Sequence, residues 1–96
     1  SPCLSSRIMT GIEITAHRLR DVDELEGILR RGGVRSMRVR ICRDESGALF
    51  VRVESPPEEM QKVLACREAL HEEGTSRGYR WVTLDLGGYR TGGGVS

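Results

Sequence analysis

The sequence lacks any long apolar run. Its 96 residues are 38% hydrophobic and 30% charged, and no stretch approaches the roughly 20 apolar residues that a membrane-spanning helix needs. The N-terminus does not show the pattern of a signal peptide. We therefore expect one small cytoplasmic domain without a membrane partner. The chain does not begin with methionine, which is typical of a cut or processed piece.

Cysteine is scarce and widely spaced. The three cysteines are Cys3, Cys42 and Cys66, and no CxxC or mixed His/Cys pattern indicates a zinc site. We predict reduced thiols and no bound metal. A three-cysteine iron–sulfur site assembled in space is the alternative, which we do not favour. The two histidines, His17 and His71, fall on predicted helices and are interpreted as surface residues.

Lysine is nearly absent. Of 15 basic residues only Lys62 is a lysine, and arginine suits bidentate binding of phosphate or carboxylate. A GC-rich genome would explain the total equally well, so the positions of the arginines matter more. A net charge of +1 and four aromatic residues, with no RNA-binding motif, predict no nucleic-acid partner.

A first helix is predicted directly after Thr15, a good N-cap. Apolar residues then recur at helical spacing: Leu19, Val22, Leu25 and Leu29. We expect four acidic residues to cover the opposite face: Asp21, Asp23, Glu24 and Glu26. Gly32 and Gly33 are expected to end this helix.

Strands and a second helix follow. Residues 37–41 and 49–53 alternate apolar and polar side chains, which predicts two strands paired as an antiparallel hairpin. Pro57 begins a second helix, expected to run to about Glu73 and to stop at Gly74. Cys66 lies at the edge of its apolar stripe and is interpreted as a packing residue. Residues 79–86 predict a third strand.

The element order is therefore α-β-β-α-β. It predicts an α+β domain in which a three-stranded sheet carries two helices on one face. We place this domain at residues 15–90, after an N-terminal arm of residues 1–14 and before a flexible tail of residues 91–96.

Arginines gather on the sheet face away from the helices. Aligning the apolar faces of the hairpin places Val39 opposite Val51 and Arg38 opposite Arg52, with Arg40 beside them. Because like charges across a strand pair are destabilising, something should compensate. Glu54, one step diagonal, and a bound anion are both candidates, while a solvated basic face is the bland alternative. Residues Trp81, Thr83 and Asp85 share this face if the third strand joins with matching orientation.

The N-terminal arm contains one chemically suggestive residue. Cys3 follows Pro2 and has Arg7 four positions away. A nearby cation lowers the pKa of a thiol, and the thiolate is the reactive form. The alternative is an idle cysteine in a loose terminal segment.

Four stretches together resemble the C-terminal part of a known family. This family comprises the ATP-dependent sacrificial sulfur transferases that build the nickel-pincer nucleotide cofactor of lactate racemase. The stretches are Pro2–Ile8 with Gly11 and Ile14-Thr15, Met37–Arg40, Val53-Glu54 before Pro56–Glu58, and Tyr79–Leu86 with Gly88–Gly92. The resemblance covers nearly the whole chain in order, and its specificity lies in the combination.

The resemblance implies a reaction. In that family a PP-loop ATP pyrophosphatase domain adenylates a carboxylate of a pyridinium mononucleotide. A cysteine attacks, AMP leaves, and cleavage of the cysteine's carbon–sulfur bond leaves dehydroalanine and a thiocarboxylate. By this resemblance Cys3 is the sulfur donor, with Arg7 able to favour its thiolate.

The resemblance also implies a binding site. Arg38 and Arg40 match paired arginines that suit a nucleotide phosphate. Three further residues fall in shared motifs and are taken as substrate-binding candidates: Glu54, Asp85 and Arg90.

The chain departs from the family in two places. The PP-loop signature, a Ser-Gly-Gly run followed by an Asp-Ser pair, is absent, so ATP and Mg²⁺ are expected on a separate PP-loop domain or subunit. The usual Tyr-Gly after the cysteine motif is Thr10-Gly11 here, which leaves the exact substrate open. Our leading hypothesis is a sulfur-donor and oligomerisation domain acting in a homo-oligomer. The alternative is a non-catalytic anion-binding or assembly domain that acts with a separate PP-loop ATPase.

Overall fold

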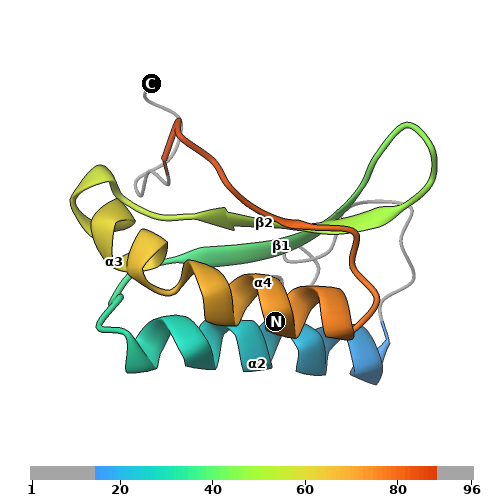
Figure 1. Cartoon of the computed structure of the whole chain (residues 1–96), viewed down its shortest axis with the longest axis horizontal. Helices are drawn as coiled ribbons and strands as arrows, with labels where there is room; N and C mark the ends of the chain where they lie inside the picture. Colours follow the sequence, from blue (N-terminus) through green and yellow to red (C-terminus); the bar gives the residue numbers. More distant parts are fainter. Residues whose placement is uncertain (1–14, 89–96) are drawn as a thin grey trace.

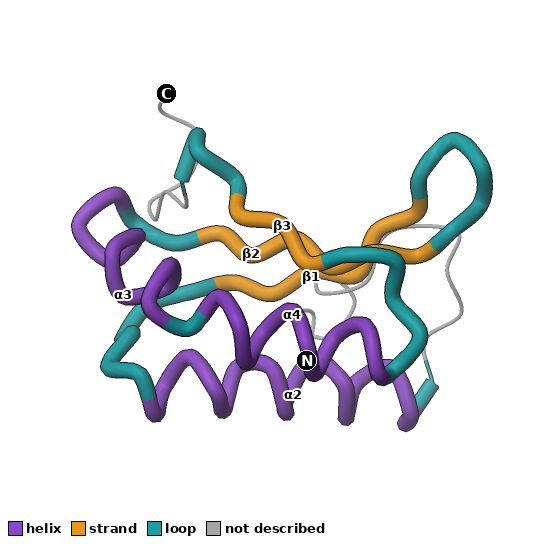
Figure 2. The backbone as a smooth tube through the Cα atoms, viewed as in Figure 1, coloured by secondary structure: helices purple, strands orange, loops and turns teal. Residues whose placement is uncertain are grey.

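The computed structural model describes residues 15–88, in which helices pack against one side of a small sheet (Figure 1). The α+β class and the order α-β-β-α-β are confirmed, with the second helical region divided into shorter pieces. The tube view shows α2 and α4 side by side beneath the strands (Figure 2). No described helix is long and apolar enough to cross a membrane.

Helix α2 spans Ala16–Arg31 and begins and ends where the sequence predicts. Thr15 Oγ1 accepts a hydrogen bond from Arg18 N at 3.1 Å, and the Gly32 N–H donates to carbonyls of the last turn. The expectation that its acidic residues all face solvent is wrong for two of them. Asp21 is fully buried and Glu26 is 3% exposed, because arginine side chains reach both carboxylates and replace the water they lose.

The sheet has the strand order β1-β2-β3, formed by β1 (Arg38–Arg43), β2 (Leu49–Glu54) and β3 (Val82–Leu84). Strands β1 and β2 are antiparallel, as predicted. Strand β3 joins β2 in parallel after the helical crossover. The central strand β2 therefore carries both neighbours.

The hairpin register differs from the predicted one by two residues. Ile41 pairs with Val51, and Arg40, not Arg38, lies opposite Arg52. The loop sets this register. Asp44 Oδ1 accepts hydrogen bonds from the Ser46 and Ala48 backbone N–H groups at 2.9 Å each, and Asp44 N donates to Ala48 O at 2.9 Å. A carboxylate that closes the turn in this way fixes which residues face each other.

The predicted second helix is not continuous. It consists of a 3₁₀ turn η1 (Pro57–Glu59), α3 (Met60–Ala65) and α4 (Arg67–Ser76), with a break at Cys66. The stop at Gly74 is wrong, because Gly74 is helical and buried. The chain instead turns at Gly78, whose φ of +99° suits glycine.

The third strand is shorter than predicted. Only Val82–Leu84 pair as a strand, while Tyr79 turns inward and is 2% exposed. Leu86 is 83% exposed and contributes nothing to the core.

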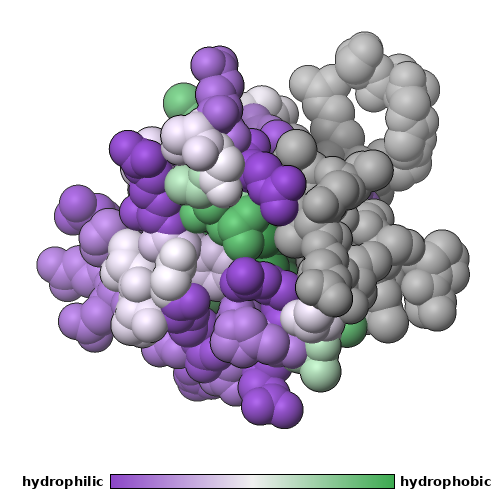
Figure 3. Space-filling model, turned by 90° about the vertical axis from the view of Figure 1, so that its right-hand side faces the viewer, coloured by the Kyte–Doolittle hydropathy of each residue, from purple (hydrophilic) through white to green (hydrophobic). Residues whose placement is uncertain are grey.

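Aliphatic side chains fill the space between the helices and the sheet. The fully buried ones come from α2, β1 and β2: Val22, Leu25, Leu29, Val39, Ile41 and Val51. Cys66 packs against this cluster, as predicted. Mostly hydrophilic side chains cover the end of the molecule that holds the hairpin loop (Figure 3). The core lies on one side of the sheet, which leaves the other face available for charged residues.

Candidate functional site

Five polar side chains occupy the sheet face opposite the helices. Strand alternation places them there, because Val51 and Val53 of β2 are buried in the core on the other side. We call this surface the arginine face, and it consists of Arg38, Arg40, Arg52, Glu54 and Thr83. The register aligns Arg40, Arg52 and Thr83 in one row across all three strands.

Glu54 offsets the repulsion between the paired arginines. Its Oε1 lies 3.3 Å from Arg40 Nε and its Oε2 lies 3.0 Å from Arg52 Nη2. The Glu54 side chain is 12% exposed, against 25% for Arg40 and 40% for Arg52. One nearly buried carboxylate thus holds two partly exposed cations. Glu54 is one of the candidates that the sequence offers for this role, although the observed register sets it opposite Arg38 and diagonal to Arg40. Charged hydrogen bonds of this kind are the stronger ones.

Arg52 does not use all of its donors. Its Nε is enclosed and makes no hydrogen bond among the described residues. An enclosed donor without an acceptor costs roughly 1–3 kcal/mol. This N–H is thus a donor of the arginine face that a bound oxyanion would satisfy.

The other predicted binding residues with described positions flank this row. Arg38 faces Glu54 in the register. Asp85 N donates to Val53 O at 2.8 Å, which brings Asp85 to the end of β2. Its side chain stabilises the following turn, however, because Asp85 Oδ1 accepts a hydrogen bond from Gly87 N at 2.8 Å. Thr83 Oγ1 donates to Val51 O at 3.0 Å.

Cys42 lies on the same face, opposite Phe50. It is buried, with 8% exposure. Burial raises the pKa of the Cys42 thiol, and this effect exceeds the lowering by Arg52 and Arg40. Cys42 therefore remains a protonated thiol at neutral pH and is poorly suited to act as a nucleophile.

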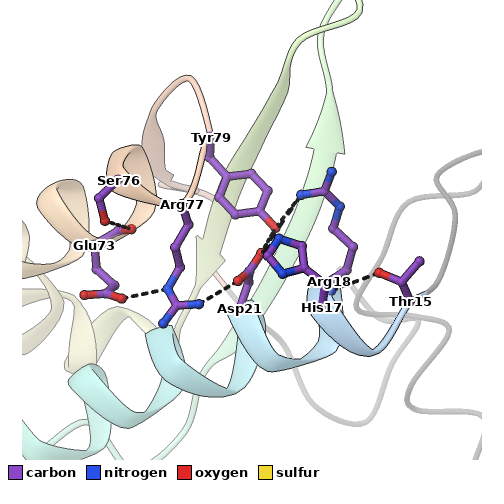
Figure 4. A network of polar contacts seen from close by, with 8 residues as sticks. All are labelled: Thr15, His17, Arg18, Asp21, Glu73, Ser76, Arg77 and Tyr79. Carbon is purple, nitrogen blue, oxygen red and sulfur yellow. Dashed lines mark hydrogen bonds and ion pairs between the residues drawn. The ribbon is translucent and has the colours of Figure 1, made fainter.

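A second polar cluster lies between α2 and the start of β3 (Figure 4). Asp21 Oδ2 accepts from Tyr79 Oη at 2.5 Å, and Asp21 Oδ1 accepts from Arg77 Nη1 at 2.7 Å. Arg18 Nη1 donates to Tyr79 Oη at 3.1 Å, while His17 Nε2 lies 3.5 Å from Asp21 Oδ2. Burial, with the bond to Asp21, raises the pKa of Tyr79 to about 12.

Sequence reasoning missed this second cluster. Arg18 and Tyr79, two of its members, are 61 residues apart in the sequence, and the local signal is the spacing of Asp21, four residues before the core residue Leu25. Both Asp21 oxygens are engaged by buried or half-buried donors, so the cluster joins elements together. It leaves no open position for a ligand atom on Asp21.

Three predicted site residues lie outside the described residues: Cys3, Arg7 and Arg90. Within residues 15–88 no group of three or more His, Cys, Asp or Glu side chains is arranged to hold a metal ion. The described part of the chain presents guanidinium groups on the sheet face opposite the helices, and guanidinium groups suit oxyanions.

Two known proteins are similar to this chain over nearly its whole length. The chain is 40% identical, over 95% of its length, to an uncharacterized protein of Synechocystis sp.. It is 34% identical, over 93% of its length, to the pyridinium-3,5-bisthiocarboxylic acid mononucleotide synthase of Lactiplantibacillus plantarum. The chain spans only about a third of these relatives, 33% and 30% of their lengths. No family model matches the chain.

Proposed function

We propose that this chain is the C-terminal part of a sulfur transferase of cofactor biosynthesis, with its arginine face binding the phosphate of a pyridinium mononucleotide. The observation that carries the proposal is the Arg40–Arg52 pair, held at a nearly buried Glu54. The similarity to a mononucleotide synthase supports it independently. ATP chemistry is assigned to a separate PP-loop domain or subunit, and the functional unit to a homo-oligomer.

Cys3 is the proposed sulfur source. Its thiolate attacks the adenylated carboxylate of the substrate, a thioester forms, and AMP leaves with the electron pair of the broken C–O bond. A base then removes the Cα proton of Cys3, and the Cβ–S bond breaks with its electrons passing to sulfur. The products are a thiocarboxylate and a dehydroalanine at position 3, so each chain donates once.

The role of Cys3 is tested by mass. The full-length protein, with its PP-loop domain or subunit, is incubated with ATP and the mononucleotide. The mass of the peptide that contains Cys3 is then measured by mass spectrometry. We expect a loss equal to one H₂S, in proportion to the thiocarboxylate formed. Cys3→Ser should abolish product, whereas Cys42→Ala should retain it, because Cys42 is a buried thiol of raised pKa. Product formation with an unchanged peptide mass would overturn the assignment and favour a non-catalytic binding domain.

The phosphate site is tested by calorimetry with a pyridinium mononucleotide. Arg40→Ala removes one charged contact to the phosphate, which is worth about 1.5–3 kcal/mol. We therefore expect binding to weaken on the order of 10- to 100-fold. Arg20→Ala is the matched control, because Arg20 is an exposed arginine of α2 on the other side of the domain. Equal affinities for the two variants would rule out the arginine face as the phosphate site.

A further inference from the structure

Two of the four aromatic side chains in this chain meet on the arginine face. Phe50 of β2 lies two residues before Arg52, and Trp81 lies two residues before Thr83. Their ring centroids are 6.3 Å apart at an interplanar angle of 51°. The core is made mostly of aliphatic residues, so these rings are not needed to fill it.

Trp81 is partly open to solvent. Its exposure is 40%, in a chain whose other apolar side chains near the sheet are mostly buried. The Arg80 guanidinium lies over the indole, 4.7 Å from its centroid. Arg80 itself is 52% exposed, and its Nη1 lies 3.8 Å from Asp44 Oδ2. The Trp81 indole is therefore partly accessible to solvent, and an exposed guanidinium, that of Arg80, lies over it.

We propose that Phe50 and Trp81 form a ring subsite that takes the pyridinium ring of the substrate, a proposal that rests on the proposed function. The spacing fits a mononucleotide. Residues two apart in a strand are about 6.6 Å apart, so the aromatic row lies one such step from the Arg40–Arg52 row. A mononucleotide separates its phosphate from its ring by one ribose. A phosphate on the arginines therefore directs the ring toward Phe50 and Trp81.

The chemistry of the two ends also selects this orientation. A pyridinium ring is a flat cation, and the faces of tryptophan and phenylalanine attract such groups. Arg80, beside the indole, suits the carboxylate that the ring carries. At the opposite end of the arginine face, the described residues offer Glu54 and the turn at Asp85, and none of these is aromatic. The arginine row thus suits the phosphate, and the aromatic row suits the pyridinium ring.

The single tryptophan makes this subsite directly observable. The chain is titrated with a pyridinium mononucleotide and, separately, with ribose 5-phosphate, which has the phosphate but no ring. Stacking on Trp81 should quench its fluorescence with the mononucleotide and leave it nearly unchanged with ribose 5-phosphate. The absence of quenching at saturating mononucleotide would overturn the ring subsite.

Variants separate this subsite from the phosphate site. By calorimetry, Trp81→Leu should weaken mononucleotide binding on the order of tenfold, which matches the loss of one ring stack, and should leave ribose 5-phosphate binding unchanged. Trp81→Phe should restore most of the affinity. Arg40→Ala should weaken both ligands.

Each negative result shows which of the two proposed sites is wrong. If Arg40→Ala weakens both ligands while Trp81→Leu weakens neither, the ring subsite is wrong and the phosphate site stands. If Trp81→Leu weakens the mononucleotide while Arg40→Ala has no effect, the phosphate site is wrong and the ring subsite stands. If neither ligand binds the wild-type chain, both are wrong.

Discussion

At the scale of single residues, the buried carboxylates of Asp21 and Glu54 have different roles. Asp21 is fully buried, and its oxygens accept from Tyr79 and Arg77 at 2.5 and 2.7 Å. Glu54 is 12% exposed at its side chain, and its partners stand 3.0 and 3.3 Å away. Removing the oppositely charged partner of a buried ion pair costs about 3–5 kcal/mol. Asp21 is therefore fixed in place and structural.

The partners of Glu54 are easier to exchange. Arg40 and Arg52 are 25% and 40% exposed at their side chains, so each can turn toward an anion at little cost in desolvation. Because Glu54 is nearly buried, taking both guanidinium groups away from it would be costly. The proposed phosphate therefore shares these guanidinium groups with Glu54, since each has five N–H donors. This difference is why we place function at Glu54 and not at Asp21.

At the scale of elements, Gly74 sets how closely α4 approaches β3. A Cβ built at Gly74 would overlap Val82 Cγ2. Alanine normally favours a helix over glycine by about 1 kcal/mol, but overpacking costs about 1–3 kcal/mol. We expect Gly74→Ala to lower the free energy of unfolding by up to about 2 kcal/mol, measured by urea denaturation.

Two further variants make this test decisive. Gly27 of α2 is the matched control, because a Cβ there would meet only the flexible end of Arg31, at 3.4 Å. Gly27→Ala should stabilise the chain by up to about 1 kcal/mol. In a Gly74→Ala/Val82→Ala double variant the two losses should not add, because the trimmed Val82 leaves room for the new methyl group. Stabilisation by Gly74→Ala would contradict the close approach of α4 to β3.

Elements with local signals could be predicted from the sequence. Helix α2 has its N-cap at Thr15, a regular apolar period and a glycine stop, and its bounds agree with the structure. The hairpin register could not be obtained in this way, because matching apolar faces allows shifts of two residues. The turn geometry at Asp44 selects one of them. The glycine at 74 resembles a helix stop locally, and only packing against β3 shows its actual role.

At the scale of the whole molecule, the position of the charged side chains is more informative than the net charge. The net charge is only +1, yet Arg40, Arg52 and Glu54 meet on one side of the sheet. The sequence predicts this face, because strand alternation and a diagonal carboxylate are both local features. It does not predict the Asp21 cluster, because Arg77 and Tyr79 reach Asp21 only after the whole crossover has folded.

Two carboxylates with lowered pKa values contribute to stability at low pH: Asp44 in the hairpin loop and Glu59 in the η1 turn. The Ser46 hydroxyl holds the pKa of Asp44 below its ordinary value, and the Arg35 backbone N–H does the same for the pKa of Glu59. A lowered folded-state pKa stabilises the fold above the unfolded-state value, near 4, and this contribution disappears as the pH falls below it. The hairpin loop and the η1 turn therefore each lose a stabilising contact as the pH falls through the folded-state pKa of their carboxylate.

Stability at high pH depends on Tyr79, and this dependence gives a sharp test of the Asp21 cluster. The pKa of Tyr79 is raised from 10 to about 12 in the folded chain, so its contribution is complete below pH 10 and is lost as the pH rises toward 12. One proton released on unfolding in that window gives a slope of up to about 1.4 kcal/mol per pH unit. Urea denaturation of the wild type at several pH values should show this fall, and Tyr79→Phe should remove it. At pH 7 the variant should be about 1–3 kcal/mol less stable, because Asp21 loses a donor. An equally steep alkaline loss in Tyr79→Phe would show that this buried tyrosine does not link α2 to the start of β3 as the structure has it.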